Sequence, residues 1–76
     1  MQKKIQLTTI KDVSQFVNAT LCAPCDIELS HGKYVVDAKS MMGVLSLDLT
    51  KPVDMTINSD TEPTEFLSKI KEFLVD

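Results

Sequence analysis

Four side chains in this 76-residue sequence are of types that carry out chemistry: Ser40, His31 and the pair Cys22 and Cys25. Ser40 stands immediately before an apolar stretch with helical spacing, where a serine hydroxyl caps a helix by accepting a hydrogen bond from a free backbone N–H. A phosphate attached there would be stabilised by the helix dipole and by the remaining free N–H groups. Ser40 therefore has a structural role in any case, and its position would also tolerate modification.

The stretch after Ser40 is apolar around more of its circumference than a short helix can bury. At about 100° per residue its apolar side chains spread over roughly 220°, about twice a normal buried stripe. These side chains are Met41, Met42, Val44, Leu45, Leu47 and Leu49. We expect some of Met41, Met42 and Leu45 to be exposed beside Ser40. Such a surface would bind a protein partner or a second copy of the chain; the alternative is a wide core helix held between two neighbours.

The segment Cys22-Ala23-Pro24-Cys25 has the spacing of a redox dithiol. In thioredoxin-like proteins such a pair opens a helix, whose positive end favours the thiolate. Here the pair follows a helix and lies near the negative end of its dipole, which disfavours the thiolate. Two cysteines also supply only half of a tetrahedral zinc site. We interpret the pair as structural or incidental, with a small dithiol redox protein as the alternative, and we expect no metal.

His31 lies in the expected hairpin turn Ser30–Lys33 and is interpreted as a solvated turn residue, with a relocated phosphoryl acceptor as the alternative. The sequence has no paired acids, phosphate-binding loop or nucleophile triad, so we expect no enzymatic activity and no cofactor.

Composition excludes further classes of function. The net charge is −3 and the eight basic residues are all lysines without clustering, which argues against nucleic-acid binding. No apolar run approaches the roughly 20 residues that cross a bilayer. The N-terminal alternation around Ile5 and Leu7 is typical of a strand and not of a signal peptide. We therefore expect one cytoplasmic domain over residues 1–76, with reduced cysteines.

Periodicity predicts seven elements in the order β-α-β-β-α-β-α. The strands are expected around residues 5–9, 27–30, 34–37 and 53–58, and the helices over 12–21, from Ser40 to about Leu49, and from an N-cap at Thr61 through Leu74. Asp12 is expected to cap the first helix or to serve as an acid in its first turn. This order predicts an α+β open-faced β-sandwich, with a four-stranded antiparallel sheet covered on one face by three helices.

The element order and one motif resemble the HPr family, the small phosphocarriers of the sugar phosphotransferase system, in the Gram-positive style. The matching stretches are Gln15-Phe16-Val17, Gly32-Lys33, Ala38-Lys39-Ser40-Met41-Met42-Gly43-Val44-Leu45-Ser46-Leu47 and Val53-Asp54-Met55-Thr56-Ile57. In Gram-positive members a serine in the middle motif is phosphorylated by a dedicated kinase. The resemblance implies that Ser40 is a regulatory phosphorylation site in carbon-catabolite regulation.

The sequence departs from the family at the catalytic loop. Family members carry a Gly-Leu-His-x-Arg-Pro pattern between the first strand and the first helix, whereas this chain has Thr8-Thr9-Ile10-Lys11-Asp12 and a loop shorter by about six residues. A phosphocarrier needs a nucleophilic imidazole at this place. We therefore expect an HPr-like regulatory or interaction module that is not a phosphocarrier. It would present the Ser40 helix to an HPr kinase, a transcriptional regulator or a phosphotransferase-system enzyme. The alternatives are the dithiol redox protein and a homodimer through Met41, Met42 and Leu45.

Overall fold

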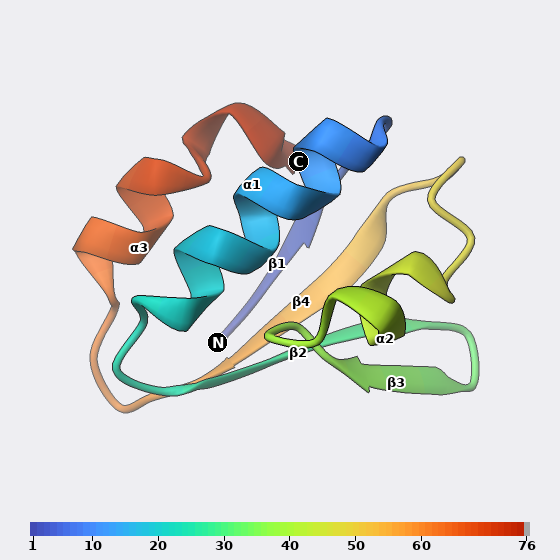
Figure 1. Ribbon diagram of the computed structural model, residues 1–76. Helices are drawn as coiled ribbons and strands as arrows, with labels where there is room; N and C mark the ends of the chain where they lie inside the picture. Colours follow the sequence, from blue (N-terminus) through green and yellow to red (C-terminus); the bar gives the residue numbers. More distant parts are fainter. Residues whose placement is uncertain (76) are drawn as a thin grey trace.

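The computed structural model describes residues 1–75 and contains one antiparallel sheet with three α-helices. The sheet order is β3-β2-β4-β1-β5. The strands are β1 (Gln2–Ile5), β2 (Asp26–His31), β3 (Tyr34–Asp37), β4 (Val53–Asn58) and β5 (Leu74–Val75). The helices are α1 (Ile10–Leu21), α2 (Met41–Leu45), α3 (Thr64–Lys69) and the short 3₁₀ helix η1 (Lys71–Phe73). Figure 1 shows α1 and α3 side by side over one half of the sheet, with α2 over the other half.

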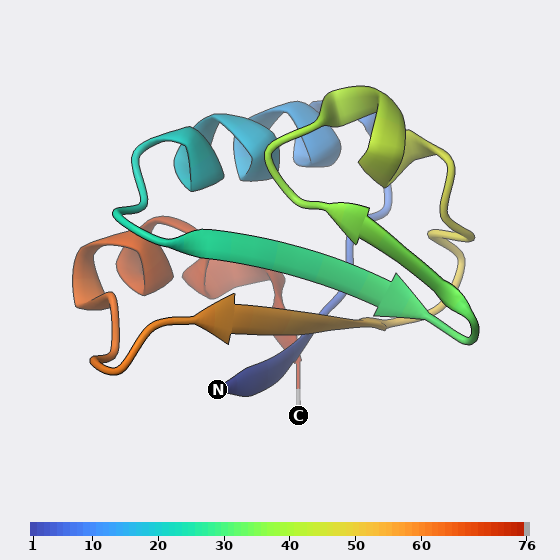
Figure 2. The ribbon, with the colours of Figure 1, turned by 90° about the horizontal axis from the view of Figure 1, so that it is seen from below.

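The core lies between the sheet and the helices, which all pack on the same face (Figure 2). Strand alternation places Val53, Met55 and Ile57 of β4 on this inner face, where each is buried. The helices supply the opposite layer. Phe16 of α1 and Phe66 of α3 meet edge to face, with ring centroids 6.4 Å apart. The expected open-faced sandwich and its helix-covered face are confirmed.

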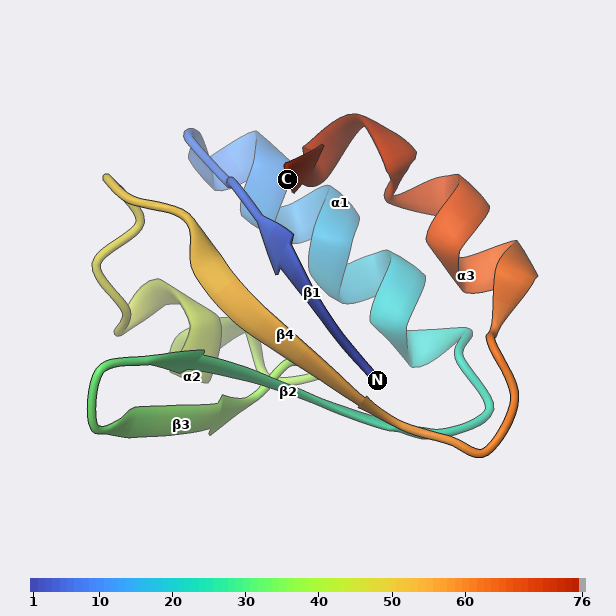
Figure 3. The ribbon, with the colours of Figure 1, turned by 180° about the vertical axis from the view of Figure 1, so that it is seen from behind.

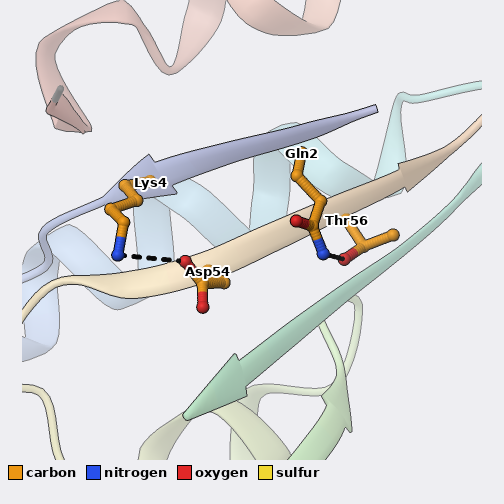
Figure 4. A network of polar contacts seen from close by, with 4 residues as sticks. All are labelled: Gln2, Lys4, Asp54 and Thr56. Carbon is orange, nitrogen blue, oxygen red and sulfur yellow. Dashed lines mark hydrogen bonds and ion pairs between the residues drawn. The ribbon is translucent and has the colours of Figure 1, made fainter.

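On β1 and β4 the outer face of the sheet is polar, and its side chains pair across the two strands. On β1 and β4, Gln2 Nε2 donates to Thr56 Oγ1 at 3.2 Å, and Lys4 Nζ lies 3.3 Å from Asp54 Oδ1 (Figure 4). Both contacts join residues that stand directly opposite in the register. The four side chains fix the two strands relative to each other without an apolar layer on this side.

The C-terminal segment differs from the prediction, because the sheet has a fifth strand and the last helix is short. The helix α3 begins after an N-cap at Pro63, and Thr61 instead exchanges hydrogen bonds with the Ser59 hydroxyl. The chain then tightens into η1, and β5 pairs with β1. Gln6 N–H donates to Phe73 O at 2.9 Å just before that pairing. A single helix through Leu74 would bury Phe66, Ile70, Phe73 and Leu74 on one stripe; the first three are buried but span two kinds of helix, and Leu74 is half-buried in β5.

The helix after Ser40 is also shorter than expected and ends at Leu45 instead of near Leu49. The Ser46 hydroxyl donates to Gly43 O at 2.6 Å, so a side chain competes for a carbonyl of the last turn. Two residues later, the Asp48 carboxylate accepts hydrogen bonds from Thr50 N–H and from the Thr50 hydroxyl. These local bonds favour a turn over a further helical turn.

We predict that apolar contacts between the layers contribute far more to stability than the paired charges of the outer face. Phe66→Ala should lower the free energy of unfolding by about 3–5 kcal/mol, because a buried aromatic ring is lost. Lys4→Ala should lower it by at most about 1 kcal/mol, since that ion pair is exposed to solvent. Urea unfolding of the two variants measures both values. Equal losses would contradict the prediction.

Candidate functional site: the Ser40 surface

Ser40 is exposed and caps α2 as the sequence predicts. Its backbone is extended (φ −102°, ψ 114°) and its Oγ accepts a hydrogen bond from Gly43 N–H at 3.2 Å. Asp37 fixes the turn before Ser40 through two hydrogen bonds. Ser40 N–H donates to the backbone oxygen of Asp37 at 3.0 Å, and Lys39 N–H donates to Asp37 Oδ1 at 2.9 Å. The hydroxyl therefore stands at a defined place at the start of a helix, open to solvent.

A buried threonine positions this turn against α1. Thr20 is fully buried, and its hydroxyl lies 2.6 Å from Val17 O and 3.2 Å from Ala38 O. Ala38 is itself buried, and its N–H donates to Ile27 O at 2.9 Å. The chain two residues before Ser40 is thus held by both α1 and β2. Sequence reasoning missed Thr20, because a threonine inside a helix gives no signal of the distant carbonyl that it will contact.

Gly43 lets α2 sit close to the edge of the sheet. A Cβ added to this glycine would lie 3.4 Å from Val36 Cβ on β3 and 3.4 Å from Ser40 Oγ. A larger side chain would push the helix away from β3 and crowd the cap. Gly43 therefore couples the packing of α2 to the geometry of Ser40.

The apolar residues of α2 divide between core and surface. Val44 is fully buried, and Met41 is half-buried and packs against the core. Of Met41, Met42 and Leu45, some of which were expected to be exposed, the latter two are. Met42 is 83% exposed and Leu45 is 43% exposed. Since residues three apart are neighbours on a helix, Met42 and Leu45 form one apolar strip near Ser40. We call Ser40, Met42 and Leu45 the Ser40 surface.

The N-terminus of α1 is occupied by a carboxylate of the chain itself. Thr9 is the N-cap and its Oγ1 accepts Asp12 N–H at 3.0 Å. In return, Asp12 Oδ2 accepts the Thr8 hydroxyl at 2.8 Å, Thr8 N–H at 3.1 Å and Thr9 N–H at 3.4 Å. Asp12 is thus the first-turn acid of a capping box, one of its two expected roles. The Thr8 hydroxyl bond, followed by the backbone bonds, holds the pKa of Asp12 below its ordinary value.

The segment between β1 and α1 runs only from Gln6 to Thr9 and contains no histidine. Its hydroxyls belong to Thr8 and Thr9, and both already take part in the capping box. The carboxylate nearest to them, Asp12, has a lowered pKa and is therefore a weak base. This arrangement holds the helix end together and offers no activated nucleophile.

The cysteines and the histidine lie elsewhere. Cys22 is an exposed free thiol at the C-cap of α1, and Cys25 is a half-buried free thiol that packs against the core just before β2. His31 is the last residue of β2 and is half-buried, so it is less solvated than expected. Its positive charge contributes to the lowered pKa of Asp48, after the larger effect of the Thr50 hydrogen bonds.

Two findings concern the described residues as a whole. Across residues 1–75, no group of three or more histidine, cysteine, aspartate or glutamate side chains is arranged to hold a metal ion. Within the same residues, every helix is too short or too polar to span a membrane.

A family model described as "PTS HPr component phosphorylation site" matches residues 10–76, which is most of the chain. The chain belongs to the HPr family. The match includes α1, the turn with Ser40, and all of α2 and α3. HPr-family proteins are phosphocarriers of the sugar phosphotransferase system and act by contact with other proteins, so protein partners follow from this membership.

Solved HPr structures have the same fold. HPr-C-His from Thermoanaerobacter tengcongensis superposes with a TM-score of 0.76 at 19% identity, covering 95% of this chain and 88% of that one. The phosphocarrier protein HPr from Bacillus anthracis strain Ames gives a TM-score of 0.72 at 21% identity, covering 99% and 96%. No curated protein sequence matches the chain significantly.

We predict that Asp12 gives the protein a distinct acid sensitivity. Its pKa is lowered from 3.8, so its stabilising effect is complete above that value and is lost as the pH falls through the lower pKa of the folded state. Urea unfolding of wild type and Asp12→Asn from about pH 6 to about pH 2 measures this. The stability advantage of wild type should shrink toward the acid end.

Asp48 also has a lowered pKa but is common to both proteins, so the difference between the two curves isolates Asp12. A difference that stays constant with pH would contradict the prediction.

Proposed function

We propose that this HPr-family chain is a regulatory interaction module and not a phosphocarrier or an enzyme. It presents the Ser40 surface to protein partners in the cytoplasm. The observation that carries this proposal is the N-terminus of α1, where the Asp12 carboxylate accepts hydrogen bonds from Thr8 and Thr9.

A phosphoryl acceptor needs a nucleophile and donors for the incoming oxygens. Between β1 and α1 the chain has only threonine hydroxyls, and the N–H groups of Thr8 and Thr9 point at Asp12. The negative charge of Asp12 repels a phosphoryl group at this helix end. The Gly-Leu-His-x-Arg-Pro pattern of the family has no counterpart in these residues.

Ser40 supports a regulatory role through its exposure and its surroundings. Its hydroxyl is open to solvent, and α2 has no acidic side chain in its first turn. A phosphate on Oγ would keep an oxygen near Gly43 N–H and add negative charge at the positive end of the helix. Phosphorylation should therefore leave the fold intact, as a reversible signal requires.

The apolar strip beside Ser40 gives the modification a means to change binding. Met42 and Leu45 are exposed, and methionine adapts well to different partner surfaces. A doubly charged phosphate nearby disfavours an apolar partner surface, because the charge loses hydration on binding. It favours a partner that offers arginine. An HPr kinase, a transcriptional regulator and a phosphotransferase-system enzyme are the partners that this surface would serve.

Two labelling reactions test the proposal on the full chain. Incubation with phosphoenolpyruvate and enzyme I of the phosphotransferase system should transfer no label, because an acceptor imidazole is lacking near α1. Incubation with an HPr kinase and ATP should add one phosphate, detected by intact mass. Ser40→Ala should prevent that gain, whereas the matched control Ser46→Ala should keep it.

Transfer of label from phosphoenolpyruvate would refute the non-carrier role. Absence of any phosphate after kinase treatment would refute the regulatory role of Ser40.

A second experiment tests the apolar strip. Met42→Asp should reduce capture of a purified HPr kinase at least about fivefold, since truncating or charging a central apolar contact costs about 1 kcal/mol or more. The fold should persist, because Met42 is 83% exposed. Val75→Asp is the control, as Val75 is 37% exposed on β5 at the opposite edge of the sheet from β3. Equal capture by both variants would contradict the assignment.

A further inference from the structure

The outer edge of β3 exposes apolar side chains that the core does not use. β3 ends the sheet order, and among the described residues its only strand neighbour is β2 (Figures 1 and 3). Tyr34 is 72% exposed and Val35 is 59% exposed. A strand edge with free backbone groups and apolar side chains is a template for pairing with another strand.

The hydrogen-bond pattern determines which backbone groups of β3 point outward. Ala38 N–H donates to Ile27 O at 2.9 Å, so these two residues form a hydrogen-bonded pair. In an antiparallel ladder such pairs alternate with pairs that make no backbone bond. In the observed register Val36 is therefore bonded to β2, whereas the N–H and C=O of Val35 and the N–H of Asp37 point away from the sheet. These groups are ready to pair on the outer side.

We propose that β3 pairs with β3 of a second copy of this chain, antiparallel and centred on Val35. In this register Val35 stands opposite Val35 of the second copy on the outer face. Lys33 stands opposite Asp37 of the second copy on the same face, and the two-fold axis repeats that pair of opposite charges. On the helix face, Tyr34 covers the half-buried Val36 of the second copy.

Charge and backbone direction select this register. Only residues whose backbone N–H and C=O point outward can form hydrogen bonds to the second copy. Every alternative register must therefore pair Val35 or one of its outward-pointing neighbours. Centring on Val36 would place Lys33 opposite Lys39 of the second copy, which is repulsive. Centring on Tyr34 would leave Asp37 beyond the end of the second β3. The Val35 register alone combines the aromatic contact with two opposite-charge pairs.

The shape of the hairpin keeps this edge accessible. The turn after His31 has Gly32 at φ 61°, and β3 follows at once with the pair His31–Tyr34. The tight turn leaves no long loop over the edge. Because β3 spans only Tyr34–Asp37, the interface is small and the dimer is weak, forming in the micromolar to millimolar range.

Sedimentation equilibrium of the full chain tests the proposal, from about 10 µM to about 1 mM and with a reducing agent to exclude disulfides through Cys22. Wild type should dimerise reversibly. Val35→Asp should weaken association at least about tenfold, because it sets two like charges across the axis. Val75→Asp, the matched change on the other edge, should leave it unchanged. Circular dichroism checks that each variant is folded.

A charge exchange tests the register itself. Lys33→Asp and Asp37→Lys should each weaken self-association about tenfold, since each sets like charges opposite each other in both pairs. An equimolar mixture should regain the wild-type affinity, because both pairs are then opposite in sign. Local damage from losing the Asp37–Lys39 bond cannot be repaired by mixing.

A wild type that stays monomeric at every concentration would overturn the proposal. So would a mixture that fails to associate, or a dimer that Met42→Asp dissociates and Val35→Asp does not, since that dimer would use the Ser40 surface. A dimer lost with Val35→Asp and regained in the mixture establishes the β3 edge.

Discussion

Burial of one face of the sheet under three short helices is the constraint on which the rest of the structure depends. A helix of five residues such as α2 does not form alone in water. It exists because Val44 is buried, because Gly43 allows a close approach to β3, and because Ser40 caps its first turn. The position of Ser40 is therefore a consequence of core packing. Any change that loosens the layer of helices also displaces the candidate regulatory hydroxyl.

The same constraint explains which apolar side chains are left over. The inner faces of β2 and β4 are buried, yet Met42 on α2 and Val35 on β3 remain exposed in a small domain that has few apolar residues to spare. Met42 lies on a helix surface, which suits a partner that recognises side chains. Val35 lies on a strand edge, which suits a partner that also forms hydrogen bonds to the backbone. The two surfaces are thus compatible with separate interactions of one chain.

The sequence predicted what depends on local periodicity and failed where distant contacts decide. Period-two alternation located β2 and β4, the β-branched and aromatic residues of Tyr34–Asp37 located β3, and serine before an apolar helix located the cap at Ser40. The two residues of β5 carry no periodicity, and their pairing with β1 joins opposite ends of the chain. Thr61 has the side chain of an N-cap, but the Ser59 hydroxyl binds its backbone and the helix starts later. In the site, the sequence predicted that some of Met41, Met42 and Leu45 are exposed but not which of them, because the width of an apolar stripe does not say which edge the core will cover.

Loss of phosphocarrier chemistry, as proposed, has a physical basis that goes beyond a missing histidine. Just before α1, the Asp12 carboxylate accepts the N–H groups of Thr8 and Thr9 together with the Thr8 hydroxyl. Those bonds lower the pKa of Asp12, so the carboxylate is charged at neutral pH and repels further negative charge. A phosphoryl group carried beside this end of the helix would meet the opposing charge of Asp12. At the start of α2, Gly43 N–H is bound by a neutral hydroxyl and the first turn carries no acid, and the Asp37 carboxylate binds Lys39 N–H just before Ser40. In the proposed function the two helix ends therefore differ in what they offer: a carboxylate that disfavours a phosphoryl group at α1, and a hydroxyl open to solvent at Ser40.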